Sequence, residues 1–165
     1  MSANSFPRAA AIEASLELLA ERCADPTPRV YERLFAEHPN MRPHFWRDTN
    51  GAVKGEMLSR VFEAILDFVG ERHYAHMMIQ TEMVTHEGYD IPREIFGTFF
   101  RTVAETAREI LAAEWTPEFE TAWDELLTEL DRYIAQTPRS DVVSPFHQAR
   151  VAAFEAGSTP ATPLL

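Results

Sequence analysis

Apolar residues recur at helical spacing along most of the chain, and this repeat restricts the fold more than any other feature. The first stretch, about residues 8–24, has its apolar side chains three or four positions apart, at Ile12, Leu16, Leu19 and Cys23. That spacing places them on one face of a helix. No stretch shows the strict apolar–polar alternation expected of a half-buried strand. The sequence therefore predicts an all-α fold.

Proline, glycine and short polar segments divide the chain into about six to eight predicted helices. Thr27–Pro28 and Thr116–Pro117 are typical helix starts, because proline is favoured in the first helical turn. These two starts open helices that end near His38 and near residue 136. Between them we expect a short helical corner at about 41–45, a polar loop at 47–51, and helices at about 52–69, 72–86 and 92–113.

The last part of the chain differs from the rest. Residues 1–137 have the pattern of one helical domain, whereas residues 138–165 contain Pro138, Pro145, Pro160 and Pro163. Such a composition is typical of a loosely held segment. We expect residues 138–165 to be a Pro-rich C-terminal extension, loosely held or partly helical, with one short helix near 146–154.

Charge and cysteine content exclude several classes of protein. The chain has 165 residues and a formal net charge of −11, which repels nucleic-acid phosphates and anionic lipid surfaces. Cys23 is the single cysteine, so no disulfide framework is possible within the chain. Glu13 and Glu17 interrupt the apolar residues near the N-terminus, so we predict no signal peptide and no membrane span. We expect a cytoplasmic protein.

One histidine, His86, stands between an aromatic corner at residues 38–46 and the pair Ala122–Trp123. A helical fold with this order of residues can hold a flat aromatic cofactor against one axial imidazole nitrogen. Neutral imidazole is a common metal ligand. The alternative is a solvated histidine at a helix C-terminus, just before Gly88, where a positive charge is favourable.

These residues resemble the globins, and most closely the bacterial single-domain and flavohaemoglobin-type globins. Residues 30–45 are similar to the second helix and corner of that group, and Ala122–Trp123 to its last-helix signature. The resemblance covers roughly residues 8–136. It implies a globin fold around a haem pocket, a haem b cofactor with its iron held by His86, and a diatomic gas ligand: O2, NO or CO.

The resemblance also implies roles for other residues. Phe45 would stack on the haem face, and Ile91 and Phe96 would be the pocket aliphatic and aromatic residues. Tyr31 would reach the distal pocket, where a phenol can donate a hydrogen bond to bound dioxygen. The second ring nitrogen of His86 would be oriented by a backbone carbonyl near Glu82 or by the hydroxyl of Thr85.

The distal helix departs from the family pattern. The usual histidine or glutamine one turn before the residue that overhangs the iron is absent. Met57 or Leu58 would be the overhanging residue, and Val53 or Lys54 would then occupy the position one turn earlier. The sequence leaves the register between these alternatives open. Lys54, like Arg47, could instead pair with a haem propionate or remain solvated.

Several functions remain compatible with the sequence. A haem protein that binds or transports oxygen or another diatomic gas is the preferred interpretation. The alternatives are a gas or redox sensor with a signalling partner, a nitric oxide dioxygenase with a separate reductase, and a haem-free globin-fold binding module. Phe96 stands where flavohaemoglobins have a proximal-side tyrosine, which weakens the dioxygenase interpretation. Oligomeric state stays open, with a homodimer as one option.

Overall fold

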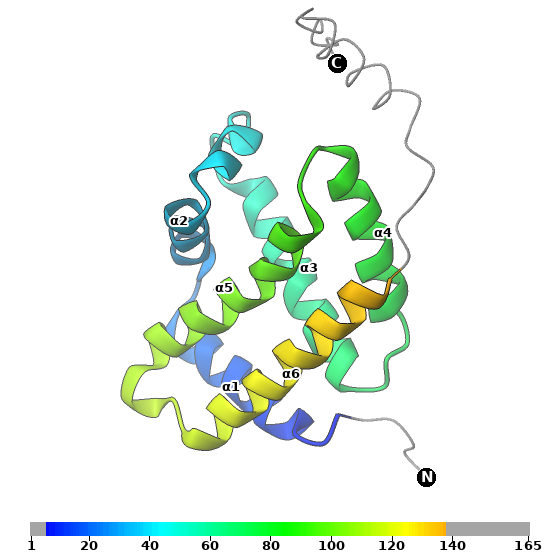
Figure 1. Ribbon diagram of the computed structural model, residues 1–165. Helices are drawn as coiled ribbons and strands as arrows, with labels where there is room; N and C mark the ends of the chain where they lie inside the picture. Colours follow the sequence, from blue (N-terminus) through cyan, green and yellow to red (C-terminus); the bar gives the residue numbers. More distant parts are fainter. Residues whose placement is uncertain (1–5, 138–165) are drawn as a thin grey trace, which may run out of the picture.

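A computed structural model describes residues 6–137 of the chain (Figure 1). Within this range it contains six α-helices, two short 3-10 helices and no strand. The prediction of an all-α fold is therefore confirmed. The predicted extension at 138–165 lies outside the described residues.

The helices have the following bounds: α1 Ala9–Arg22, α2 Thr27–Glu37, η1 Pro39–Phe45, α3 Ala52–Val69, α4 Ala75–Gly88, α5 Arg93–Leu111, η2 Ala112–Glu114 and α6 Pro117–Gln136. Each helix predicted within residues 6–137 corresponds to one of these elements, with ends that differ by at most a few residues. The short helix predicted near 146–154 lies outside the described residues. η1 is the predicted helical corner, and His38 separates it from the end of α2.

Side chains cap the N-termini of two helices at the predicted positions. Thr116 precedes α6, and its hydroxyl accepts a hydrogen bond from the backbone N–H of Phe119 at 3.1 Å. Asp25 accepts from the backbone N–H of Thr27 at 3.0 Å, where α2 begins. These bonds satisfy backbone donors that have no partner inside the helix.

The start of α4 lies at Ala75, three residues later than predicted. Asp67, near the end of α3, accepts hydrogen bonds from the backbone N–H groups of His73, Tyr74 and Ala75 at 3.1, 3.0 and 2.7 Å. Burial opposes ionisation of this carboxyl, but the three donors keep its pKa below the ordinary value. The Asp67 carboxylate therefore stabilises a turn at residues 70–74, and α4 begins only after it.

The helices enclose a single core. α1 packs on α5 and α6, α2 on α5, and α3 on α4, while α5 and α6 lie side by side (Figure 1). Trp123 of α6 is 2% exposed, and its indole N–H donates to the hydroxyl of Ser15 in α1 at 2.9 Å. A buried tryptophan with its N–H satisfied fixes the distance between the two helices.

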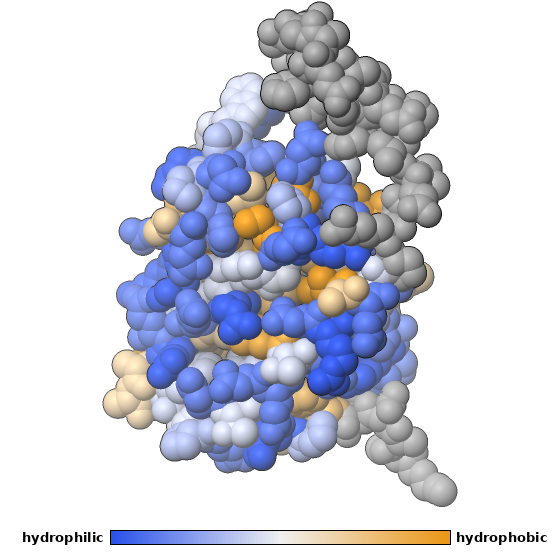
Figure 2. Space-filling view, in the orientation of Figure 1, coloured by the Kyte–Doolittle hydropathy of each residue, from blue (hydrophilic) through white to orange (hydrophobic). Residues whose placement is uncertain are grey.

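The face of the molecule drawn in Figure 2 is largely hydrophilic. Figure 2 shows small hydrophobic areas between larger hydrophilic ones on the face viewed there. Among residues 6–137, no helix is long and apolar enough to cross a membrane.

Candidate functional site

An apolar pocket opens between α2, η1, α3, α4 and α5. It contains about 810 Å3 of empty space when the part open to solvent is included. Its walls are formed by Tyr31, Leu34, Met41, Phe45, Met57, Arg60, Val61, Ala64, Met78, Ile79, Glu82, His86, Ile91, Ile95, Phe96, Phe99 and Phe100. Most of this wall is hydrocarbon, aromatic or thioether, with few polar atoms.

His86 is the histidine of the pocket wall. It lies in the last turn of α4, and its Nδ1 is 2.7 Å from the backbone oxygen of Glu82, one turn earlier. A carbonyl oxygen can only accept, so Nδ1 carries a proton, and in the neutral imidazole the lone pair is on Nε2. Of the two orienting acceptors expected from the sequence, the carbonyl is used. The Thr85 hydroxyl donates elsewhere, to the Thr81 carbonyl.

Tyr31 brings a polar atom into an apolar environment. The residue is 2% exposed, and its hydroxyl has no hydrogen-bond partner, the only such buried side-chain N or O atom within residues 6–137. Burial first, and then the negative charge of Asp48, raise the pKa of this phenol. The hydroxyl therefore remains protonated and can donate to a molecule in the pocket.

Aromatic rings surround these two side chains. Tyr31 contacts Phe45 and Phe99, with ring centroids 5.2 and 5.4 Å apart. Phe96 meets the His86 ring edge to face at 5.2 Å. These contacts restrict the rotamers of both functional side chains, so the phenol and the imidazole are held before any ligand arrives.

Helix α3 turns Met57 and Val61, one helical turn apart, into the pocket. Leu58 is 2% exposed, within the core, and is not among the residues of the pocket wall. Val53 is 54% exposed. The Lys54 ammonium pairs with Asp48 at 2.8 Å, and that carboxylate also accepts from the backbone N–H groups of Val53 and Lys54.

The structure thus brings together six of the nine residues that the sequence singled out. Tyr31, Phe45, Met57, His86, Ile91 and Phe96 line one pocket. Val53, Lys54 and Leu58 do not line it. Arg47, the other candidate for a propionate partner, lies with its guanidinium over the ring of Trp46, 4.7 Å from the centroid.

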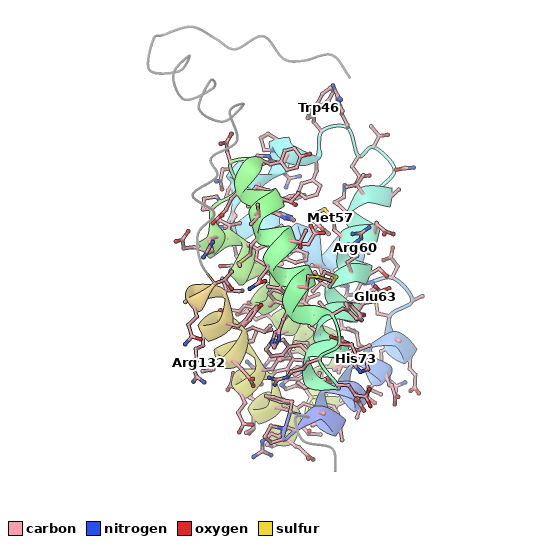
Figure 3. All side chains as sticks on the ribbon, turned by 90° about the vertical axis from the view of Figure 1, so that its right-hand side faces the viewer. Trp46, Met57, Arg60, Glu63, His73 and Arg132 are labelled. Carbon is pink, nitrogen blue, oxygen red and sulfur yellow. The ribbon has the colours of Figure 1, made fainter. Side chains whose placement is uncertain are left out.

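Sequence reasoning missed two charged side chains at this site, although it named the backbone carbonyl near Glu82. Arg60 of α3 and Glu82 of α4 both line the pocket, and their side chains approach to 3.6 Å. Figure 3 shows Met57, Arg60 and Glu63 in succession along α3, beside α4. A residue pair on two different helices leaves no signal in local spacing, so only the packing of α3 on α4 reveals it.

The fold and the site together define a class: all-helical proteins with an internal apolar pocket whose wall carries one backbone-oriented imidazole. The chain belongs to the globin family, because the family model described as Globin matches residues 28–134. The all-α globin fold predicted from the sequence is therefore established. Searches among curated proteins and among solved structures found no match.

Members of the globin family generally bind haem, and the residues of this pocket fit that group. A planar apolar macrocycle needs an apolar cavity, which aromatic and thioether side chains provide here. Haem iron needs an imidazole nitrogen with a free lone pair, and in neutral His86 with Nδ1–H bonded to the Glu82 carbonyl this would be Nε2. The orphaned Tyr31 hydroxyl further indicates a ligand that supplies the missing acceptor.

Proposed function

We propose that this chain is a haem b globin that binds a diatomic gas, with His86 as the proximal ligand and Tyr31 as the distal hydrogen-bond donor. The observation that carries the proposal is the buried, unpartnered hydroxyl of Tyr31 in the same pocket as His86. A buried hydroxyl without a partner costs about 1–3 kcal/mol, which a gas that accepts a hydrogen bond would relieve.

The proposed roles follow from the chemistry of each side chain. His86 would hold the iron through Nε2, while the Glu82 carbonyl, which accepts from Nδ1–H, fixes the orientation of the ring. Phe45, Ile91 and Phe96 line the pocket, where they would pack on the macrocycle and exclude water. Haem, when bound, supplies an iron atom with one further position for O2, NO or CO. The Tyr31 hydroxyl would donate a hydrogen bond to the gas and would keep its proton, because burial raises its pKa.

Met57 occupies the part of the distal helix that faces the pocket, and no amide or imidazole of α3 lines it. Arg60 of α3 does line the pocket, but its guanidinium pairs with Glu56 and Glu82. The phenol of Tyr31 is buried without a protein partner, so it is the donor available to a bound gas. This arrangement favours ligands in proportion to their strength as acceptors, with dioxygen above carbon monoxide.

Purified full-length protein loaded with haem tests the proposal. His86→Ala should lower haem retention at least tenfold, and added imidazole should restore part of the Soret absorption because it replaces the lost ligand. The control is His76→Ala on the same helix, where the imidazole stacks on Tyr133 and does not line the pocket. Equal haem content and identical spectra in wild type and His86→Ala would refute the proposal.

A further inference from the structure

We propose that the Glu82 carboxylate is a positioning residue that strengthens electron donation by His86, and that Arg60 limits this effect. The inference deepens the proposed function and rests on His86 being the haem ligand. Its basis is a chain of three side chains that runs along the pocket wall from α3 to the imidazole.

The first link joins Glu82 to His86 twice. The backbone oxygen of Glu82 accepts from Nδ1 at 2.7 Å, while Oε2 of its carboxylate lies 3.8 Å from the same nitrogen. Any residue at position 82 would make the backbone contact, because its carbonyl lies one helical turn before His86. A carboxylate in addition to the carbonyl is a property of glutamate, and it adds negative charge beside the N–H group.

The second link joins Glu82 to the distal helix. Oε1 of Glu82 lies 3.6 Å from the Arg60 guanidinium, whose Nε also pairs with Glu56 at 3.2 Å. Arg60 is thus divided between two carboxylates, one of them directed toward solvent and one toward the proximal histidine. The Arg60 side chain is 55% exposed and that of Glu82 31%, so solvent screens the pair without cancelling it.

These contacts have opposite electrostatic consequences for the imidazole. Negative charge close to Nδ1–H draws its proton outward and raises the basicity of Nε2, which strengthens a bond from that nitrogen to a metal. A cation paired with the carboxylate reduces the charge that Nδ1 experiences. Removal of Glu82 and removal of Arg60 should therefore change the Fe–His bond in opposite directions.

The test uses full-length protein loaded with haem, with resonance Raman spectroscopy of the ferrous form and a redox titration as readouts. In Glu82→Gln the iron–histidine stretching band should move to lower frequency and the midpoint potential should rise, since a less basic imidazole stabilises ferric iron less. In Arg60→Gln the same band should move to higher frequency. The control is Glu63→Gln on α3. Like Glu82→Gln it removes one negative charge, but Glu63 lies outside the pocket wall, so the band should not move.

The double variant Glu82→Gln/Arg60→Gln separates action through Glu82 from a direct action of Arg60 on haem. The band shift caused by Arg60→Gln should disappear in the Glu82→Gln background. An unchanged band in Glu82→Gln, or shifts of the same sign in both single variants, would overturn the inference. If the wild type shows Soret absorption but no iron–histidine band that depends on His86, the proposed function fails first, and this inference with it.

Discussion

At the scale of single residues, the site combines two polar groups that folding leaves in contrasting states. The Nδ1 of His86 is satisfied by a carbonyl at 2.7 Å, so its ring orientation is fixed. The hydroxyl of Tyr31 is buried without a partner. The first arrangement stabilises the folded chain, and the second destabilises it in return for a donor that is already in place when a ligand binds.

Removal of the Tyr31 hydroxyl should therefore weaken oxygen binding. In Tyr31→Phe, dioxygen should leave about tenfold faster or more, because a hydrogen bond worth roughly 1.5 kcal/mol or above is lost. Carbon monoxide is a poorer acceptor and should respond less. Stopped-flow measurement of both dissociation rates on the two proteins tests this, and equal oxygen rates would exclude Tyr31 as the donor.

The same substitution should have the opposite effect on the haem-free protein. Tyr31→Phe removes a buried hydroxyl that has no partner, so the apoprotein should gain about 1 kcal/mol in its free energy of unfolding. Urea denaturation of the two apoproteins measures the difference. Tyr133→Phe is the control with the opposite expectation, because the Tyr133 hydroxyl donates to the His76 carbonyl at 3.0 Å, and its loss should destabilise.

At the scale of elements, the orientation of α3 decides which residues reach the pocket. Met57 and Val61 line it, whereas Leu58 lies in the core and Val53 faces solvent. Asp48 fixes the start of this helix by accepting from the backbone N–H groups of Val53 and Lys54, each at 3.0 Å. The same carboxylate holds the Lys54 ammonium, so that side chain is turned away from a role inside the pocket.

This orientation predicts different effects for the same side chain introduced one turn apart. Glutamine at position 57 would bring an amide donor into the pocket, so Met57→Gln should slow oxygen dissociation several-fold. Val53→Gln should leave the rate unchanged, because Val53 is 54% exposed. Oxygen dissociation measured for both variants tests the register, and a slower rate in Val53→Gln alone would mean that α3 is rotated in the haem-bound protein.

The Asp48 cap should make the stability of α3 depend on acid. The hydrogen bond from the Lys54 side chain, followed by backbone N–H donors, lowers the pKa of Asp48 to about 2. A folded-state pKa below the unfolded value of about 4 means that the contribution is fully present above pH 4 and disappears as the pH falls toward 2. Asp48→Asn should therefore be less stable than wild type near neutral pH.

Urea denaturation across pH 2–7 measures this dependence. The difference between wild type and Asp48→Asn should shrink steadily below pH 4, whereas Glu56→Gln, an exposed charge change on the same helix, should give little difference at any pH. A gap between wild type and Asp48→Asn that stays constant down to pH 2 would contradict the titration of this cap.

The sequence predicted the helices better than it predicted the faces they present. Thr116 with Pro117 is a local signal, so the start of α6 could be placed from the chain alone. The apolar stripe of α3 is too broad for that kind of inference, because Met57, Leu58 and Val61 are all apolar, and only packing against other helices separates core from pocket. Arg60 and Glu82 could not be paired from sequence, since their contact depends on how α3 lies on α4.

At the scale of the whole molecule, the pocket exists only when distant parts of the chain have packed together. Its wall takes side chains from five elements, α2, η1, α3, α4 and α5. Arg93, at the start of α5, connects the segment after His86 to the end of α6: its Nε donates to Glu87 at 2.9 Å and its Nη1 to the Thr137 carbonyl at 2.5 Å. Haem binding and folding of the whole domain should therefore be coupled.

That coupling predicts a large increase in thermal stability when haem is bound. A ligand that binds only the folded state at a free concentration one hundred times its Kd adds about 2.7 kcal/mol. For a chain of this size each kcal/mol raises Tm by about 2–4 °C, so the haem-loaded protein should melt roughly 5–11 °C above the apoprotein. Circular dichroism at 222 nm, recorded during heating with and without haem, measures the shift.

The control is His86→Ala, which should lose most of the gain in Tm because it loses affinity for haem. Its apoprotein should melt near the wild-type apoprotein, since the imidazole is only partly buried. Equal Tm values with and without haem in the wild type would show that the pocket does not bind haem selectively in the folded state.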